Sequence, residues 1–231
     1  SNDALRGNPN YFISHMRHNM ARLGGQPMRI SMNELSNHDH SRFLTRTNRV
    51  IGRTASKGAE AANYGVNKGI FMEAVVMQMT WPGAPTIYYG DEAGVCGWTD
   101  PDNRRTYPWG HEDTQLIEFH KDIVRIHKEN PALIRGSHKN IYADYNILAY
   151  ARFYNDNSVI VIINNNDGER EISVDAWQAE VLDGDYMEQV MFTMRDGHSC
   201  DVVRHEVPSG ILTVKLPEYS SAVFVKRRGN K

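Results

Sequence analysis

The sequence lacks the features that are typical of several classes of protein, and each absence excludes one class. Only two cysteines occur among 231 residues, Cys96 and Cys200, and their separation gives neither a metal-ligand spacing nor a disulfide framework. We therefore expect both to be small buried residues. The sequence has no run of about eighteen apolar residues and no charged-then-apolar leader, so we expect neither a membrane span nor a retained secretion signal.

Charge of one sign is also lacking, because the net charge is only −2 at pH 7. This balance gives no electrostatic reason to expect nucleic acid or an anionic membrane as a partner. Hydrophobic residues make up 40% of the chain and aromatic residues 10%, which is enough to bury a core in one or two domains. The chain opens with Ser1 rather than Met, so we expect a piece of a longer protein. Its localisation stays open between the cytoplasm and a secreted parent.

The stretch Met32–Phe43 carries the strongest functional signal. Ile30 and Met32 alternate with polar residues, as in a short strand, and the polar run Ser36-Asn37-His38-Asp39-His40 follows. A strand that ends in a polar loop is the simplest interpretation. The carboxyl ends of strands are where α/β barrels hold their catalytic residues, so this loop is a candidate site.

Helical periodicity predicts three helices before Gly136. The first runs from an N-cap at Asn8 to about Leu23, the second covers residues 65–80, and the third runs from an N-cap at Asp113 to Asn130. A β-prone run at residues 86–89 follows the second helix. These elements form helix, strand and loop units, as in an α/β protein.

Beyond Gly136 the hydrophobic period changes from helical to alternating. Apolar runs at 147–154, 159–163 and 222–225 predict strands, and Asn166-Asp167-Gly168 fits a tight hairpin connection. Several short strands with such turns indicate an antiparallel β-sandwich. We therefore predict an α/β plus all-β fold, with one domain at residues 1–136 and a second at residues 137–231.

Four segments in the expected order resemble the α-amylase superfamily of glycoside hydrolases. The triplet Asn37-His38-Asp39 resembles the segment that closes the seventh barrel strand, and residues 82–92 look like the eighth strand. Residues 100–109, with Asp100-Pro101 and Arg104-Arg105, are similar to a segment of neopullulanases and cyclomaltodextrinases, and residues 130–136 resemble the end of the final barrel helix. The resemblance implies the last βα units of a (β/α)8 barrel followed by a β-sandwich.

The resemblance also implies roles for five residues. Asp39 would stabilise the positively charged transition state of glycoside cleavage, with Asn37 and His38 binding the substrate beside it. Asp100 and Arg104 would hold an outer glucose unit. Simpler structural roles stay open: Asp39 as a cap of the following loop or helix, and Asp100 with Arg104 as a salt bridge inside their own loop.

The active site implied in this way is incomplete. A full barrel needs about 250 residues, and retaining glycosidases need a nucleophile and an acid/base carboxylate about 5 Å apart, which this superfamily places on the fourth and fifth strands. None of the 28 acidic residues lies in a segment that resembles either one. We therefore expect an inactive C-terminal fragment of an α-glucan hydrolase that partners the remainder of the parent barrel. A cut barrel exposes strand edges, so we also expect the fragment to self-associate, to rearrange, or to fold only through its sandwich and packed helices.

Two other classes of function stay open. One is a carbohydrate-binding module without catalysis. In any of these sugar sites, Trp98 and Trp109 would be either platforms for sugar rings or wall residues. The other is a metal-dependent hydrolase built on His38, Asp39 and His40. The favoured α-glucan hydrolase needs neither a metal nor a cofactor from this chain. The sequence does not distinguish α-1,4 from α-1,6 specificity, because the discriminating residues lie largely on the missing strands.

Overall fold

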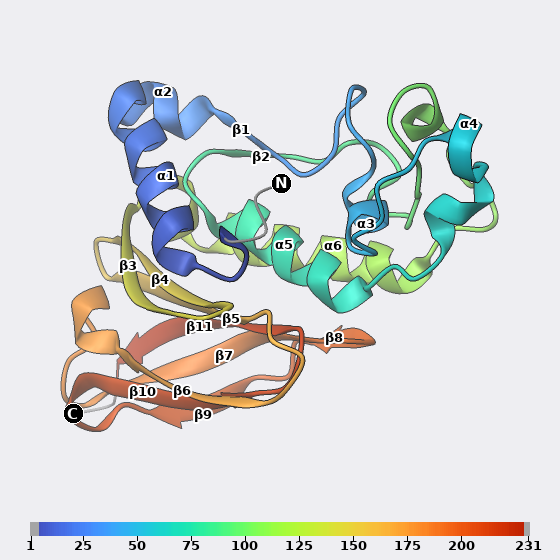
Figure 1. The fold of residues 1–231 in the computed structure, drawn as a ribbon. Coiled ribbons are helices and arrows are strands. Elements are labelled where there is room, and N and C mark those ends of the chain that lie inside the picture. The colour runs from blue at the N-terminus through green and yellow to red at the C-terminus, as the bar shows by residue number, and fades with distance from the viewer. Residues whose placement is uncertain (1–4, 229–231) are drawn as a thin grey trace.

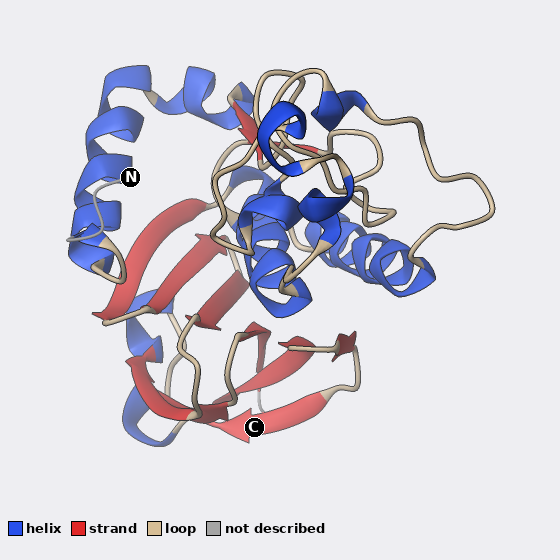
Figure 2. Ribbon diagram, turned by 45° about the vertical axis from the view of Figure 1, so that its right-hand side comes forward, coloured by secondary structure: helices blue, strands red, loops and turns tan. Residues whose placement is uncertain are grey.

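The computed structural model describes residues 5–228 and divides into two parts of different secondary structure. Helices dominate up to Gly136, and antiparallel strands dominate from Ser137 onward (Figure 1, Figure 2). We call residues 5–136 the helical region and residues 137–228 the sheet region. The change in hydrophobic period after Gly136 therefore marked a real change of secondary structure. No helix within residues 5–228 has the length and apolar character needed to cross a membrane.

The three long helices of the helical region begin at polar side-chain caps. Asn8 and Asp113 accept hydrogen bonds from the backbone N–H groups of Tyr11 and Leu116, so both predicted N-caps are confirmed. The helices are α1 (Pro9–Leu23), α2 (Gly25–Ile30), α3 (Phe43–Arg46), α4 (Thr54–Lys57), α5 (Lys68–Thr80), α6 (Thr114–Glu129) and α7 (Pro131–Arg135). Short 3-10 turns lie at Glu60–Asn63, Asp102–Arg104, Ala176–Ala179 and Pro208–Gly210.

Two short strands of the helical region pair in parallel. In β1 (Met32–Glu34) and β2 (Ala84–Thr86), Met32 lies opposite Ala84 and Glu34 lies opposite Thr86. Helices α3, α4 and α5 form the connection between them. The amide of Gln78 in α5 fixes the pair, because its Nε2 donates to the carbonyl oxygens of Asn33 at 3.0 Å and Thr86 at 2.7 Å. Since the strands are parallel, their carboxyl ends meet at one edge.

Both strands differ in extent from the prediction. Ile30 ends α2 rather than starting β1, and the Ser31 hydroxyl closes this helix by donating to the Pro27 carbonyl at 2.8 Å. The second strand ends at Thr86, so Tyr88 and Tyr89 lie beyond it. A buried guanidinium packs on both of these rings, and this tertiary contact overrides their β propensity.

The sheet region contains two antiparallel sheets. A seven-stranded sheet has the order β3-β4-β5-β11-β7-β8, with β9 also pairing with β7, and a two-stranded sheet joins β10 to β6. Its strands are β3 (Ser137–Asp144), β4 (Ile147–Tyr154), β5 (Asn157–Asn164), β6 (Arg170–Asp175), β7 (Asp185–Met194), β8 (Gly197–Ser199), β9 (Val203–Glu206), β10 (Ile211–Leu216) and β11 (Ser220–Arg228). The antiparallel part of the predicted fold is therefore confirmed.

The larger sheet is buried on both faces. Ile147 and Ala149 of β4 share one hydrophobic cluster with Ile172 and Leu212 of the smaller sheet. Alternate side chains of the same strand, such as Tyr150, join a second cluster with residues of α5 and α6. The two regions thus form a continuous core, as the helices covering the sheet in Figure 1 indicate.

Two local predictions need correction. The connection Asn166-Asp167-Gly168 does not join a hairpin, because β6 pairs with β10 instead of β5. Buried Asn164 fixes this crossover between the sheets through a hydrogen bond from its Nδ2 to the Gly168 carbonyl at 3.0 Å. Cys96 is buried as expected, but Cys200 is only partly buried, and both are free thiols.

Candidate functional site

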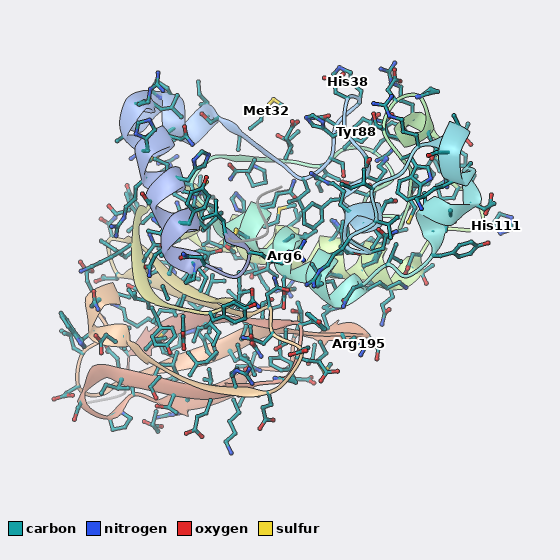
Figure 3. All side chains as sticks on the ribbon, in the orientation of Figure 1. Arg6, Met32, His38, Tyr88, His111 and Arg195 are labelled. Atoms are coloured by element: carbon teal, nitrogen blue, oxygen red, sulfur yellow. The ribbon has the colours of Figure 1, made fainter. Side chains whose placement is uncertain are left out.

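Asn37 organises the loop that follows β1. Its side-chain oxygen accepts hydrogen bonds from the backbone N–H groups of Asp39 at 2.9 Å and His40 at 3.1 Å. Its amide nitrogen donates to Glu34 Oε1 at 2.6 Å. This turn leaves the side chains of His38 and Asp39 exposed, at 67% and 66% of their surface, and His38 projects outward in Figure 3. His38 Nε2 lies 3.5 Å from Asp39 Oδ1.

The segment after β2 brings the second predicted pair to the same edge. Arg104 Nε lies 2.9 Å from Asp100 Oδ1, and both side chains are about half exposed. The same Nε donates to the His38 carbonyl oxygen at 3.3 Å. All five residues named from the sequence, Asn37, His38, Asp39, Asp100 and Arg104, thus lie on two loops in direct contact.

Asn103 is a site residue that the sequence did not reveal. It is fully buried, and its Nδ2 donates to the carbonyl oxygens of Asn37 at 3.2 Å and His40 at 2.8 Å. The Thr99 hydroxyl adds a hydrogen bond to the Asp39 carbonyl at 3.3 Å. These bonds fix the backbone on which the exposed side chains stand. No sequence signal identifies Asn103, since its partners are backbone carbonyls some sixty residues away.

Arg42 is the second residue that the sequence left unassigned. It follows the polar run that ends at His40, and no role was predicted for it. Its side chain is fully buried, and its Nη1 donates to the Tyr89 carbonyl at 2.6 Å and to Asp91 Oδ1 at 3.0 Å. The guanidinium also packs 4.0 Å from the centre of the Tyr88 ring.

Burial shifts the pKa values of the charged groups that anchor the two loops. Burial raises the pKa of Asp91, while hydrogen bonds from Ser36 and Arg42 and the charge of Arg42 oppose the rise. Burial lowers the pKa of Arg46, which donates to the Leu35 carbonyl. The charges that anchor the loops are therefore partly desolvated, whereas the carboxylates of Asp39 and Asp100 are open to solvent and to a ligand.

The aromatic residues near the loops divide into two kinds. Trp98 is buried and its indole N–H donates to the Gly58 carbonyl at 3.0 Å, so it is a wall residue and the sugar-platform reading is wrong for it. Trp109 is 80% exposed and its ring centre lies 4.5 Å from that of Tyr107. This pair offers an apolar ring face on the surface, a geometry on which sugars and other rings stack.

The side chains of His38, Asp39 and His40 do not gather as a metal site. Within residues 5–228, one group of three neighbouring His, Cys, Asp or Glu ligands occurs, and it consists of Asp122, His198 and Cys200. The geometry therefore gives no support to a metal-dependent hydrolase built on the triplet. The exposed imidazole, carboxylates and guanidinium on the two loops suit hydrogen bonds to hydroxyl groups and stabilisation of a positive charge.

The chain is similar to several known proteins. No family model matches the chain. The chain is 37% identical over 185 residues to an amylopullulanase of Thermoanaerobacter thermohydrosulfuricus, a match covering 72% of this chain and 12% of the relative. It is 37% identical over 143 residues to neopullulanase 2 of Thermoactinomyces vulgaris, covering 60% and 21% of the two chains.

A solved structure supports the fold. The crystal structure of an Anoxybacillus α-amylase superposes with a TM-score of 0.70 at 21% identity, over 89% of this chain and 40% of that enzyme. The chain therefore spans about an eighth to a fifth of the curated relatives named above and less than half of the solved enzyme. In each case the match covers more than half of this chain.

Proposed function

We propose that this chain, which is similar to a C-terminal portion of α-amylase superfamily glycoside hydrolases, carries part of the active site of an α-glucan hydrolase. One observation carries the proposal. Arg104 Nε lies 2.9 Å from Asp100 Oδ1 and 3.3 Å from the His38 carbonyl oxygen, at the carboxyl-end edge of two parallel strands. This contact brings two sugar-site segments, recognised separately in the sequence, to one place.

In this proposal β1 and β2 are the seventh and eighth strands of a (β/α)8 barrel, and α5 and α6 are the helices that follow them. Their parallel pairing and the order strand, helix, strand, helix support the assignment. The barrel domain then covers residues 1–136 and the sheet domain residues 137–231. Within residues 5–228, β1 pairs only with β2, so its other edge is available to the remainder of the parent barrel.

Asp39 is the transition-state stabiliser in this proposal. Its exposed carboxylate stands on a backbone fixed by Asn37, Asn103 and Thr99, so little reorganisation is needed when positive charge develops on the sugar ring. His38 hydrogen-bonds sugar hydroxyls beside it, and Asn37 contributes by holding the turn. The cap role that the sequence left open for Asp39 has no support from these hydrogen bonds, because the acceptor of the turn is Asn37.

Asp100 and Arg104 hold an outer glucose unit. Both are half exposed, and their ion pair presents the guanidinium edge and the carboxylate together, which suits vicinal hydroxyl groups. The sequence left a loop-internal salt bridge as the alternative, and the ion pair is indeed formed. Contact with His38 links this pair to the Asp39 loop, which a purely loop-internal bridge would not need.

The chain alone lacks the nucleophile and the acid/base carboxylate of the reaction. Asp39 has nothing to stabilise without them, so we propose that cleavage needs the preceding part of the barrel. The test is incubation of the purified chain with maltotriose, pullulan and a cyclodextrin, alone and with a separately produced N-terminal barrel half. We expect products only in the mixture. Turnover by the chain alone that survives repurification would show that the cutting residues have been misassigned.

A further inference from the structure

A cluster of three potential metal ligands joins the helical and sheet regions and contains none of the candidate site residues. Asp122 lies on α6, His198 on β8, and Cys200 just after β8. One ligand atom from each lies within 4.8 Å of the others. We propose that Asp122, His198 and Cys200 bind a zinc-class divalent metal ion that ties α6 to the end of β8.

The three donors match the chemistry of such an ion. Zinc takes imidazole nitrogen, thiolate sulfur and carboxylate oxygen at about 2.0 to 2.3 Å and usually completes a tetrahedron with a fourth ligand. His198 Nε2 already lies 3.0 Å from Asp122 Oδ2, so only small side-chain movements are needed to place an ion between the donors. A hollow of about 260 Å³ borders Cys200 and Arg125 on one side of the group.

Neighbouring residues hold the donors in position. Arg125 lies 3.3 Å from Asp122 Oδ1, the oxygen that does not face His198, so it orients the carboxylate without occupying the metal-facing oxygen. The ring of Phe119 packs edge-on against the His198 ring at 5.3 Å between centres. The His198 side chain is only 11% exposed, which separates this group from the exposed histidines of the surface.

Binding is balanced in protons and charge. The Cys200 S–H bond breaks and its proton passes to solvent. His198 releases to solvent the Nε2 proton that it donates to Asp122 Oδ2 and carries one proton on Nδ1, taken up from solvent if the ring was neutral, so that Nε2 can coordinate. The Asp122 carboxylate and the Cys200 thiolate then neutralise the two positive charges of the ion. Without metal, His198 and Asp122 are joined by a hydrogen bond of 3.0 Å. The inference is independent of the α-glucan site, because it uses none of that site's residues.

Cobalt(II) is the probe, since a cobalt–thiolate bond gives a near-ultraviolet charge-transfer band that imidazole and carboxylate ligands alone do not give. We expect one cobalt per chain, with this band, and displacement of the cobalt by zinc. Zinc at about a hundredfold excess over Kd should raise Tm by roughly 5 to 10 °C. If the unaltered chain gives no thiolate band with cobalt, the proposal is wrong, whatever the variants show.

Matched variants locate the site. Cys200→Ser should abolish the thiolate band, His198→Gln should weaken cobalt binding at least tenfold, and Cys96→Ser should leave the band unchanged. Cys96 is the matched control because it is the other free thiol. A band that survives Cys200→Ser, or that disappears in Cys96→Ser, contradicts the assignment. Circular dichroism of each variant shows whether it is folded, so loss of the cobalt band can be told apart from loss of structure.

Discussion

Arg42 and Asp91 form a buried ion pair, with Arg42 Nη1 3.0 Å from Asp91 Oδ1, that joins the loop after β1 to the turn after β2. Neither residue reaches the exposed edge where Asp39 lies. The pair, with the hydrogen bond from Arg42 Nε to the Asn103 carbonyl at 2.8 Å, instead fixes the two candidate site loops relative to one another. Stability and catalysis should therefore respond to different substitutions within the same two loops.

Arg42→Met tests the anchoring role. The variant leaves the buried Asp91 carboxyl without its cation, so we expect the free energy of unfolding to fall by about 3 to 5 kcal/mol, measured by urea denaturation at pH 7. Arg228→Met is the matched control, because its partner Asp156 is exposed and such pairs contribute about 1 kcal/mol or less. Equal losses in the two variants would show that Arg42 is no anchor.

Arg104→Ala tests the outer sugar contact in the parent enzyme. Removing a group that contacts only an outer glucose unit should raise KM for long oligosaccharides several-fold and leave kcat nearly unchanged. Arg105→Ala is the contrast, since Arg105 is bound to Asp102 and to the Ala59 carbonyl and should lower Tm instead. If Arg104→Ala changes Tm and not KM, the loop-internal salt bridge is its main role.

His138 predicts a pH dependence of stability. Burial, with the nearby charges of Arg152 and Arg17, lowers the pKa of His138 to about 3. The unfolded chain takes up this proton near pH 6.5, so stability is lost as pH falls from about 6.5 toward 3. His138→Phe should lose up to about 2 kcal/mol less than the unaltered chain between pH 7 and pH 5. The exposed His18→Gln is the control, and an unchanged slope in His138→Phe would refute this assignment.

Exposed apolar residues at β1 predict self-association of the isolated chain. Ile30 is 78% exposed and Met32 is 63% exposed, beside a strand edge that has no partner within residues 5–228. Light scattering should give an oligomer, and Met32→Lys should shift it toward monomer. Ile51→Lys is the control, because Ile51 is 90% exposed but lies outside the strands. If light scattering shows that the unaltered chain is a monomer, this prediction is wrong, but the other predictions are unaffected.

The sequence predicted elements whose pattern is local. The caps at Asn8 and Asp113, the strands of the sheet region and the polar loop at Asn37-His38-Asp39 all follow from neighbouring residues. It failed where a distant partner decides the outcome. Tyr88 and Tyr89 leave the strand to pack on Arg42, and the turn at Asn166-Asp167-Gly168 carries the chain to another sheet.

The candidate site shows the same division. Its exposed residues were recognised because the motifs are short and contiguous, whereas Arg42 and Asn103 act through bonds across 47 to 66 residues. The cluster of Asp122, His198 and Cys200 could not be seen from spacing either, because 76 residues separate the first two. These residues could be identified only from burial and from contacts between distant parts of the chain, which a local sequence pattern does not show.

Asp39→Ala in the full-length parent enzyme tests the central claim most directly. Loss of a preorganised transition-state contact should remove roughly 3 to 4 kcal/mol of stabilisation, so we expect the rate of α-glucan cleavage to fall more than a hundredfold. Tm should stay nearly constant, because the Asp39 side chain is exposed. Asp167→Ala, at an exposed carboxylate in the sheet region, should retain full activity. Normal turnover with a lowered Tm in Asp39→Ala would contradict the proposal that Asp39 acts in catalysis.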